Sequence, residues 1–306
     1  MTDKKRRKFS SEEKIMLLIA VPFVVYIFAF SYVPLFGWLY AFTDFRLADG
    51  PNPLTHQFVG FRNFMQIFAE RREVTRVLTN TLALSSLGLL MSPLAPLLAI
   101  LFMEIRSHKL KMITQTITTF PNFISWVIVY GIAFSFFSNQ GVIASIRPLL
   151  GLPPQQISLL ADVDVVWRFQ TALGVWKNVG WGAIIYVAAI SGIDESLYEA
   201  ARIDGANKLQ CIRHITIPGI SETFLVLFLL NISHILSTNF EQQLVFNNSM
   251  VTSRLMGLDL YVYRIGIMRF QYSFSIAVGM VRTFIGLTLL FGSNWLAKKI
   301  RGESLV

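Results

Sequence analysis

The sequence predicts an all-α, polytopic membrane protein with six transmembrane helices. Of its 306 residues, 54% are hydrophobic and only 15% are charged, and the mean hydropathy is +0.54. A globular protein needs more charge than this to keep its surface hydrated. Nearly charge-free runs recur along the chain, and each approaches or exceeds the roughly 20 residues of a membrane-crossing helix. These runs are residues 15–43, 77–103, 112–146, 168–193, 223–240 and 270–297.

The first run, Ile15 to Thr43, is interpreted as a retained span and not as a secretory signal peptide. Its apolar part is longer than the hydrophobic region of such a peptide, and no small-residue cleavage site closes it. It contains Pro22 and Pro34, which membrane helices tolerate where neighbours or water satisfy the freed carbonyls. We expect a kink or an early end near Pro34.

The lysines predict the orientation of the chain. If the basic cluster Lys4 to Lys8 is cytoplasmic, six spans place nine of the ten lysines on that side, and Lys177 within a span. The net charge of +9 is therefore an orientation signal, and no nucleic-acid partner is expected. The predicted organisation is a cytoplasmic basic N-terminus at 1–14, a single six-span domain at 15–297 and a cytoplasmic tail at 298–306.

Several kinds of chemistry are not expected in this chain. Cys211 is the only cysteine, and the four histidines have no ligand spacing, so neither a disulfide nor a metal site is predicted. No G-x-x-x-x-G-K-[ST] loop is present to bind nucleotide phosphates. We expect no cofactor and no catalytic residues here. If ATP drives the protein, ATP and Mg would be bound by separate ATPase subunits.

The segment from Phe58 to Phe68 is expected to form a short amphipathic helix outside, near the lipid headgroups. Its sequence Val59-Gly60-Phe61-Arg62-Asn63-Phe64 resembles the VGxxNF segment of sugar-importer permeases. The outer segments carry arginine but no lysine. The planar guanidinium of arginine can bind a carboxylate through two hydrogen bonds, which suits it better than lysine for this role. A partner protein or an acidic solute could use those arginines, while ordinary solvated loop charge is the alternative.

The polar segment 194–218 lies between two apolar runs. Asp194 and Ser196 are N-cap candidates for a helix at 197–203, and Gly205 can adopt the left-handed conformation that ends it. A second helix is expected from Ala206, with Pro218 in the first turn of the fifth span. Such a helix–turn–helix would move as a rigid body.

The same segment resembles the EAA motif of ABC importer permeases. Glu199-Ala200-Ala201, Gly205 and Ile215-Thr216-Ile217-Pro218 have the family spacing, with Ile217 where the family usually has Leu. The resemblance implies a docking loop for an ATPase, to which the alanines allow close approach and the acidic residues offer charge. A plain interhelical loop is the alternative. The predicted coupling residues are Glu199, Ala200, Ala201, Asp204, Gly205 and Pro218.

The whole chain is similar to maltose-type carbohydrate permeases, and among them to permeases for alginate-like and pectin-derived saccharides. Residues 176–186, 192–201 and 261–266 carry this resemblance. It implies the type I ABC importer permease fold in the bacterial inner (cytoplasmic) membrane, with both termini cytoplasmic. The implied partners are a second homologous permease, two ABC ATPase subunits and an extracellular or periplasmic solute-binding protein.

Polar side chains in the fifth span are candidates for a solute path. Asn231, His234, Thr238 and Glu241 follow at offsets of 3, 4 and 3, which places them on one face of a continuous helix. Sugars require such hydrogen-bonding groups. Hydrogen bonds between helices, worth about 1 kcal/mol each, are an equal alternative.

Lys177 and Arg282 are the two cations expected at membrane depth. A lone cation there costs several kcal/mol unless it meets water or a counter-charge, so both are expected to face inward. Either could help an anionic saccharide to cross, or bond structurally to a carbonyl or to the partner permease. Structure is favoured for Lys177, because the Trp-Lys pair recurs in the resemblance whatever the solute. The role of Arg282 is open.

The sequence thus predicts the non-catalytic permease subunit of an ATP-driven, binding-protein-dependent oligosaccharide importer, with acidic saccharides of alginate or pectin type among the candidates. The alternatives are a permease for a sugar phosphate or a peptide-like solute, a membrane-embedded enzyme, and an ATP-independent channel or secondary transporter. The enzyme would need paired catalytic groups at membrane depth, and the spans supply none.

Overall fold

The structure, a computed structural model, describes residues 10–50, 52–153 and 157–301. These residues form helices and turns, and the one β contact among them is an antiparallel bridge between Thr43 and Phe58. The predicted all-α fold is therefore confirmed. The predictions made for the Lys4 to Lys8 cluster and for residues 302–306 lie outside the described residues.

Six helical stretches of the described chain are long and apolar enough to cross a membrane, which matches the predicted number. Their bounds agree closely with the predicted runs for the first, fourth and sixth spans and less well for the others. The six stretches are Ile15–Phe42, Arg71–Glu104, Trp126–Leu150, Val166–Ser191, Lys208–Ser233 and Tyr272–Trp295.

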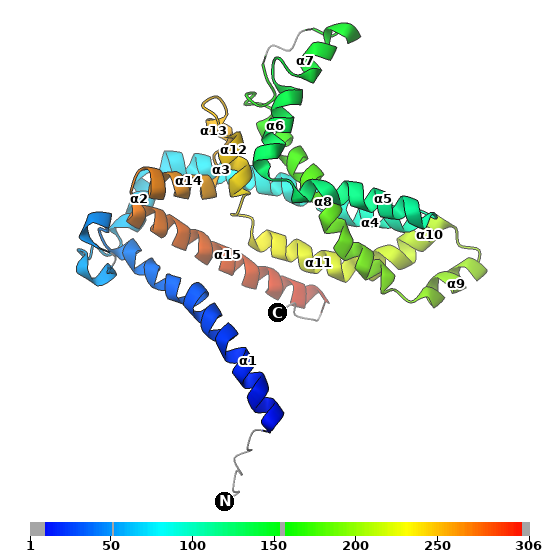
Figure 1. The fold of residues 1–306 in the computed structure, drawn as a ribbon, viewed down its shortest axis with the longest axis horizontal. Helices are drawn as coiled ribbons and strands as arrows, with labels where there is room; N and C mark the ends of the chain where they lie inside the picture. The colour runs from blue at the N-terminus through cyan, green and yellow to red at the C-terminus, as the bar shows by residue number, and fades with distance from the viewer. Residues whose placement is uncertain (1–9, 51, 154–156, 302–306) are drawn as a thin grey trace, which may run out of the picture. The chain divides into compact units, whose positions relative to one another are not determined.

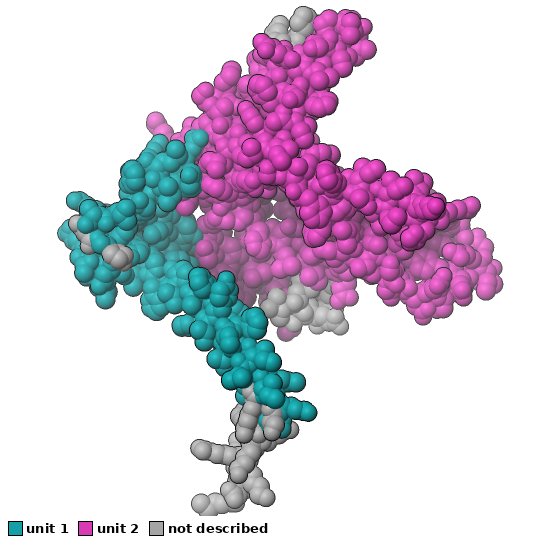
Figure 2. All heavy atoms as spheres, viewed as in Figure 1, with its two compact units in different colours: residues 1–69, 263–280 teal, residues 70–262, 281–306 magenta. Residues whose placement is uncertain are grey.

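The chain divides into two compact units, coloured separately in Figure 2. Unit 1 comprises residues 1–69 and 263–280, and unit 2 comprises residues 70–262 and 281–306. The coupling segment and the cavity described below lie entirely within unit 2. The two units are therefore described separately.

The first span of unit 1 changes its helical geometry along its length. Helix α1 (Ser11–Ile27) continues as a π-helical turn at Phe28–Tyr32 and then as a 3-10 helix at Val33–Phe42. Pro34 lies in the first turn of the 3-10 segment, where its missing N–H removes one helical hydrogen bond. The expected irregularity near Pro34 is thus a change to a tighter helix.

The predicted amphipathic element of unit 1 is helix α2 (Arg62–Ala69). Asn63 is buried and donates from Nδ2 to the carbonyls of Ala41 and Thr43, at 2.8 and 3.1 Å. These bonds satisfy carbonyls at the end of the first span. Phe61 and Phe68 remain exposed, as an interfacial helix requires. Its location in the interface stays a prediction.

Helix α8 (Val166–Ser191) is the centre of unit 2. It packs on α3 (Arg71–Leu90), α4 (Leu94–Glu104) and α5 (His108–Thr119), as Figure 1 shows. The contact with α5 depends on Gly180, because a β-carbon at this position would overlap the backbone carbonyl of Thr118. An apolar core joins α4, α8 and the fifth span, and it contains Ala99, Ile100, Phe102, Ala183, Tyr186, Ile190 and Ile220.

The predicted third run, 112–146, is not one helix. Helix α5 gives way to a 3-10 turn at Phe120–Phe123, and α6 (Trp126–Phe137) starts anew with Ser125 as its N-cap. Pro121 lies in this break and lacks the N–H that would continue the helix. The break is followed by α6 and the short α7 (Val142–Ile146), which belong to the membrane-length stretch Trp126–Leu150.

The fifth span begins and ends earlier than predicted. It runs from α10 (Lys208–Cys211) through a π-helical turn into α11 (Ile217–Ser233), and the chain then leaves the helix for residues 234–239. Figure 1 shows this link between α11 and α12. The remaining helices are α9 (Glu195–Ile203), α12 (Phe240–Phe246), α13 (Thr252–Leu255), α14 (Leu258–Tyr263) and α15 (Tyr272–Arg301).

Candidate functional site

The predicted coupling segment folds as a helix, a tight turn and a second helix. Asp194 caps α9 by accepting a hydrogen bond from the backbone N–H of Ser196 at 3.0 Å. That bond, together with one from the Ser196 hydroxyl, lowers the pKa of Asp194 below its usual 3.8. The carboxylate is therefore charged throughout the physiological range, at the helix end where negative charge is favourable.

The end of α9 depends on Gly205, whose φ is +81°. The N–H of Ala206 bonds to the carbonyl of Ala201 and the N–H of Gly205 to that of Arg202, at 2.9 and 3.1 Å. This is the Schellman pattern, which requires the left-handed residue that the sequence predicted. Asn207 and Gln210 then form a capping box that starts α10.

Two contacts brace this coupling knob, defined as residues 194–211, against the rest of unit 2. The Tyr198 hydroxyl lies 2.9 Å from Oγ1 of Thr216, and Lys208 forms an ion pair with Glu104 at the end of α4. The tip stays open, since Ile203 and Leu209 are 86% and 73% exposed. A rigid, exposed knob of this kind is suited to docking. The predicted residues Glu199, Ala200, Asp204, Gly205 and Pro218 are exposed, and Ala201 is half-buried.

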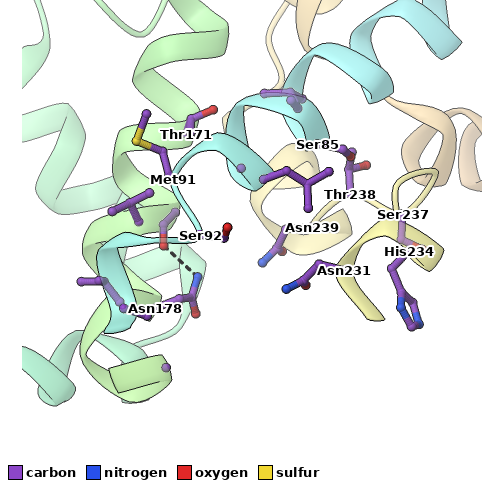
Figure 3. Close-up of a pocket in the computed structure, with 18 of the residues that line it drawn as sticks. Ser85, Met91, Ser92, Thr171, Asn178, Asn231, His234, Ser237, Thr238 and Asn239 are labelled. Atoms are coloured by element: carbon purple, nitrogen blue, oxygen red, sulfur yellow. Dashed lines mark hydrogen bonds between the residues drawn. The ribbon is translucent and has the colours of Figure 1, made fainter. Parts of the chain in front are cut away.

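A cavity of about 560 Å³ lies elsewhere in unit 2. Its walls come from the end of α3, the turn after it and the start of α4, from α8, from α11 and residues 234–239, and from α12 and α13 (Figure 3). The volume is in the range of small-molecule sites. The polar lining residues are Ser85, Ser92, Gln170, Thr171, Asn178, Asn231, His234, Ser237, Thr238, Asn239, Gln242 and Gln243.

None of the described residues that line this cavity is Asp, Glu, Lys or Arg. Part of the polar lining is already paired within the protein: Nε2 of Gln242 donates to Oε1 of Gln170 at 2.7 Å. Gln243 is 2% exposed; its Oε1 accepts from the N–H of Gly257 at 3.2 Å, and its Nε2 has no partner in the described chain. The cavity thus offers hydroxyls, amides and the imidazole of His234.

The expectation that Asn231, His234, Thr238 and Glu241 share one helical face is wrong. Helix α11 ends at Ser233, so the last three do not continue its periodicity. Asn231, His234 and Thr238 nevertheless line the cavity, because the link between α11 and α12 carries them along its wall. Glu241 is in the first turn of α12, exposed and outside the lining.

Lys177 lies outside the cavity lining and is 7% exposed. Its ammonium donates to the carbonyls of Pro121, Asn122 and Ile124, at 3.2, 2.7 and 2.7 Å, and lies 5.6 Å from the ring centre of Trp126. The three carbonyls lie in the break between α5 and α6, and that of Pro121 also accepts from the N–H of Ile124, at 3.3 Å. All three donor positions of the ammonium are therefore used within the protein.

Arg282 also lies outside the cavity lining. Its Nη1 forms an ion pair with Oδ1 of Asp259, and its Nη2 donates to Oγ of Ser237. The side chains of Arg282 and Asp259 are 29% and 15% exposed, so the pair is largely shielded from solvent. The counter-charge that a membrane-depth arginine requires thus comes from α14 of the same chain.

Sequence reasoning missed the contributions of α3 and α8 to the cavity. Gln170, Gly174 and Asn178 follow at offsets of 4 and 4 on α8, whereas Ser85 is in α3 and Ser92 is in the turn after it. The positions on α8 form a helical stripe of small or polar residues, so the 3.6-residue period could have found them. Among the described residues, no group of three His, Cys, Asp or Glu side chains is placed to hold a metal ion.

Comparison with known proteins identifies the family. Residues 87–302 match the family described as "Binding-protein-dependent transport system inner membrane component". This match covers well over half of the chain. The chain belongs to this family. It is therefore a transport component of the inner membrane and, as a member of a non-catalytic family, not an enzyme.

Curated relatives of the permease span nearly its whole length. Protein LplB of Bacillus subtilis (strain 168) is 39% identical over 96% of the permease and 91% of the relative. The polygalacturonan/rhamnogalacturonan transport system permease protein YteP of the same organism is 34% identical with the same two coverages. An arabinooligosaccharides transport system permease protein, AraP of B. subtilis, is 26% identical over 97% and 93%.

A solved structure has the same fold as the permease. A chain of the bacterial alginate ABC transporter, in complex with an alginate pentasaccharide-bound periplasmic protein, aligns with a TM-score of 0.85 at 28% identity. The alignment covers 96% of the permease and 97% of that chain. The expected resemblance to permeases of binding-protein-dependent ABC importers is thus confirmed, as is the expected importer permease fold.

Proposed function

We propose that the permease imports oligosaccharides and recognises them through their hydroxyl groups. The observation that carries this proposal is the cavity of about 560 Å³ with twelve polar lining residues, none of them Asp, Glu, Lys or Arg, in a chain of a transport family. Hydroxyl and amide groups are suited to the many donors and acceptors of a sugar. The names of YteP and AraP, which refer to saccharides, support the same solute class.

The charge of the solute is the finer part of the proposal. YteP and the alginate transporter are named for acidic saccharides, which favours uronic acids. Against this, the two cations expected in the spans are bonded within the chain, and the lining carries no basic side chain apart from His234. Carboxylates would have to be met by amides or by the partner subunits. The same lack of cations disfavours a sugar phosphate.

The proposed assembly contains a second homologous permease, two ATPase subunits that bind ATP and Mg, and an external solute-binding protein. The exposed coupling knob, braced at Tyr198 and Lys208, would fit a groove on an ATPase and transmit its closure to α11. Both termini of the permease would then be cytoplasmic, on the side of the knob.

The test is reconstitution of the whole complex in liposomes with ATP inside. ATP hydrolysis and solute uptake are measured after addition of binding proteins loaded with neutral or uronic-acid oligosaccharides of equal length. Stimulation of both activities by a loaded binding protein supports the proposal and identifies the charge class. Uptake of a peptide or a sugar phosphate alone, or uptake without any ATPase subunit, would contradict it.

A further inference from the structure

The ion pair between Asp259 and Arg282 lies directly behind two hydroxyls of the cavity wall. Residues 234–239 break the fifth span, and irregular backbone at membrane depth is tolerated where it lines a cavity. The backbone N–H of Thr238 would be unpaired at such a break. It donates instead to Oδ2 of Asp259, at 2.8 Å.

The pair also determines whether each of the two hydroxyls is left to donate or to accept a hydrogen bond. Oγ of Ser237 accepts from the guanidinium of Arg282, so its own proton remains to be donated. Oγ1 of Thr238 donates to Oδ2 of Asp259 at 3.4 Å, so its lone pairs remain to accept. Both side chains line the cavity. Adjacent residues therefore present one donor and one acceptor.

We propose that Asp259 and Arg282 are positioning residues that hold the 234–239 link in place and set Ser237 as a donor and Thr238 as an acceptor toward the solute. A sugar hydroxyl, which both donates and accepts, matches such a pair. This inference rests on the proposed function for the class of solute. The part that concerns residues 234–239, which Asp259 and Arg282 hold in place, does not depend on the solute.

A double-mutant cycle on the reconstituted complex tests the route through Ser237. Arg282→Gln and Ser237→Ala are each expected to lower the maximal uptake rate per assembled complex about tenfold. The concentration of loaded binding protein at half-maximal rate should not change, because docking is outside the cavity. If Arg282 acts through Ser237, the double variant is no slower than either single variant.

The outcomes separate positioning from a purely structural role. A structural role would reduce the amount of assembled complex and leave the rate per complex unchanged. An additive loss of about a hundredfold in the double variant, or uptake at the wild-type rate in Arg282→Gln, would overturn the proposal. If Arg282→Gln does not assemble, Arg282→Lys, which keeps the charge but loses the planar fork, replaces it in the same cycle. Arg76→Gln is the control, because Arg76 forms an exposed ion pair with Glu73.

A second measurement needs no knowledge of the solute. Cys211 is the only cysteine, so Cys211→Ser with Asn239→Cys gives one thiol on the cavity wall. Its rate of labelling by a water-soluble maleimide should rise about tenfold with Arg282→Gln and should not change with Arg76→Gln. An unchanged labelling rate would contradict the claim that Arg282 holds residues 234–239 in place, whatever the complex transports. A raised rate without oligosaccharide uptake would contradict only the proposed function.

Discussion

The ammonium group of Lys177 lies 2.7 Å from the carbonyl oxygen of Ile124. Ile124 lies in the break between α5 and α6, and Lys177 comes from the middle of α8. The cation thus replaces the N–H donors that a continuous helix would have supplied at this point. It joins two parts of unit 2 that are more than fifty residues apart in the sequence.

Lys177→Met should therefore destabilise the permease without a specific effect on anionic solutes. Three carbonyls would lose a charged donor, and one such hydrogen bond contributes about 1.5–3 kcal/mol, so a loss of about 3 kcal/mol is expected. The midpoint of thermal unfolding of the purified complex measures this. Lys109→Met, at an exposed position, is the control. An unchanged midpoint combined with weaker uptake of acidic saccharides alone would assign Lys177 to the solute.

Gly180→Ala should disrupt the contact between α5 and α8. The added β-carbon would overlap the Thr118 carbonyl, and overpacking of this kind costs about 1–3 kcal/mol. Gly131→Ala in α6 is the matched control, because nothing lies within 4 Å of its β-carbon position. We expect a lower unfolding midpoint for Gly180→Ala only. Equal midpoints for the two variants would show that the helices adjust.

Gly205→Ala should loosen the coupling knob. A non-glycine residue in the left-handed conformation costs about 1–2 kcal/mol, and the Schellman bonds depend on that conformation. Hydrogen exchange in residues 199–206 should become faster, and fewer solute molecules should be imported per ATP hydrolysed. Gly192→Ala is the control, since Gly192 also ends a helix but at φ −87°. Normal coupling in Gly205→Ala would argue against the knob as the transmitting element.

Thr171→Asp would place a negative charge in the uncharged cavity. We expect it to slow uptake of uronic-acid oligosaccharides at least tenfold more than uptake of neutral ones, a difference of about 1.4 kcal/mol. Thr171→Asn, of similar size and uncharged, should not discriminate. The measurement is paired uptake of neutral and acidic oligosaccharides of the same length. Equal slowing of both classes would mean that the solute does not pass close to α8.

Local signals predicted the coupling knob well. Asp194 and Gly205 act on residues within a few positions of themselves, so the cap and the left-handed turn could be read from the sequence. The number of spans followed likewise from apolar runs. The break at 234–239 could not be predicted, because its stabilising partners, Asp259 and Arg282, are distant in the chain. The break at 120–125 has a local signal in Pro121, but the residue that bonds its carbonyls, Lys177, is also distant.

The cavity lining was predicted only in part, and the prediction assumed a continuous fifth helix that the structure does not have. Asn231, His234 and Thr238 were assigned to one helical face, whereas they reach the cavity because the helix stops at Ser233. The same periodicity placed Glu241 beside them. Because a separate helix, α12, begins before Glu241, this residue lies outside the cavity lining. Extending the predicted helix beyond its end thus identified three residues that line the cavity and one, Glu241, that does not.

The order of synthesis along the chain bears on how the two membrane-depth cations enter the bilayer. The carbonyls of Pro121 to Ile124 are made before Lys177, and Ser237 and Asp259 are made before Arg282. Each charged helix can therefore find its acceptors already synthesised when it leaves the translocon. The insertion cost of the charge is then offset by a partner from an earlier segment. Biogenesis of α8 and α15 would thus depend on the segments that precede them.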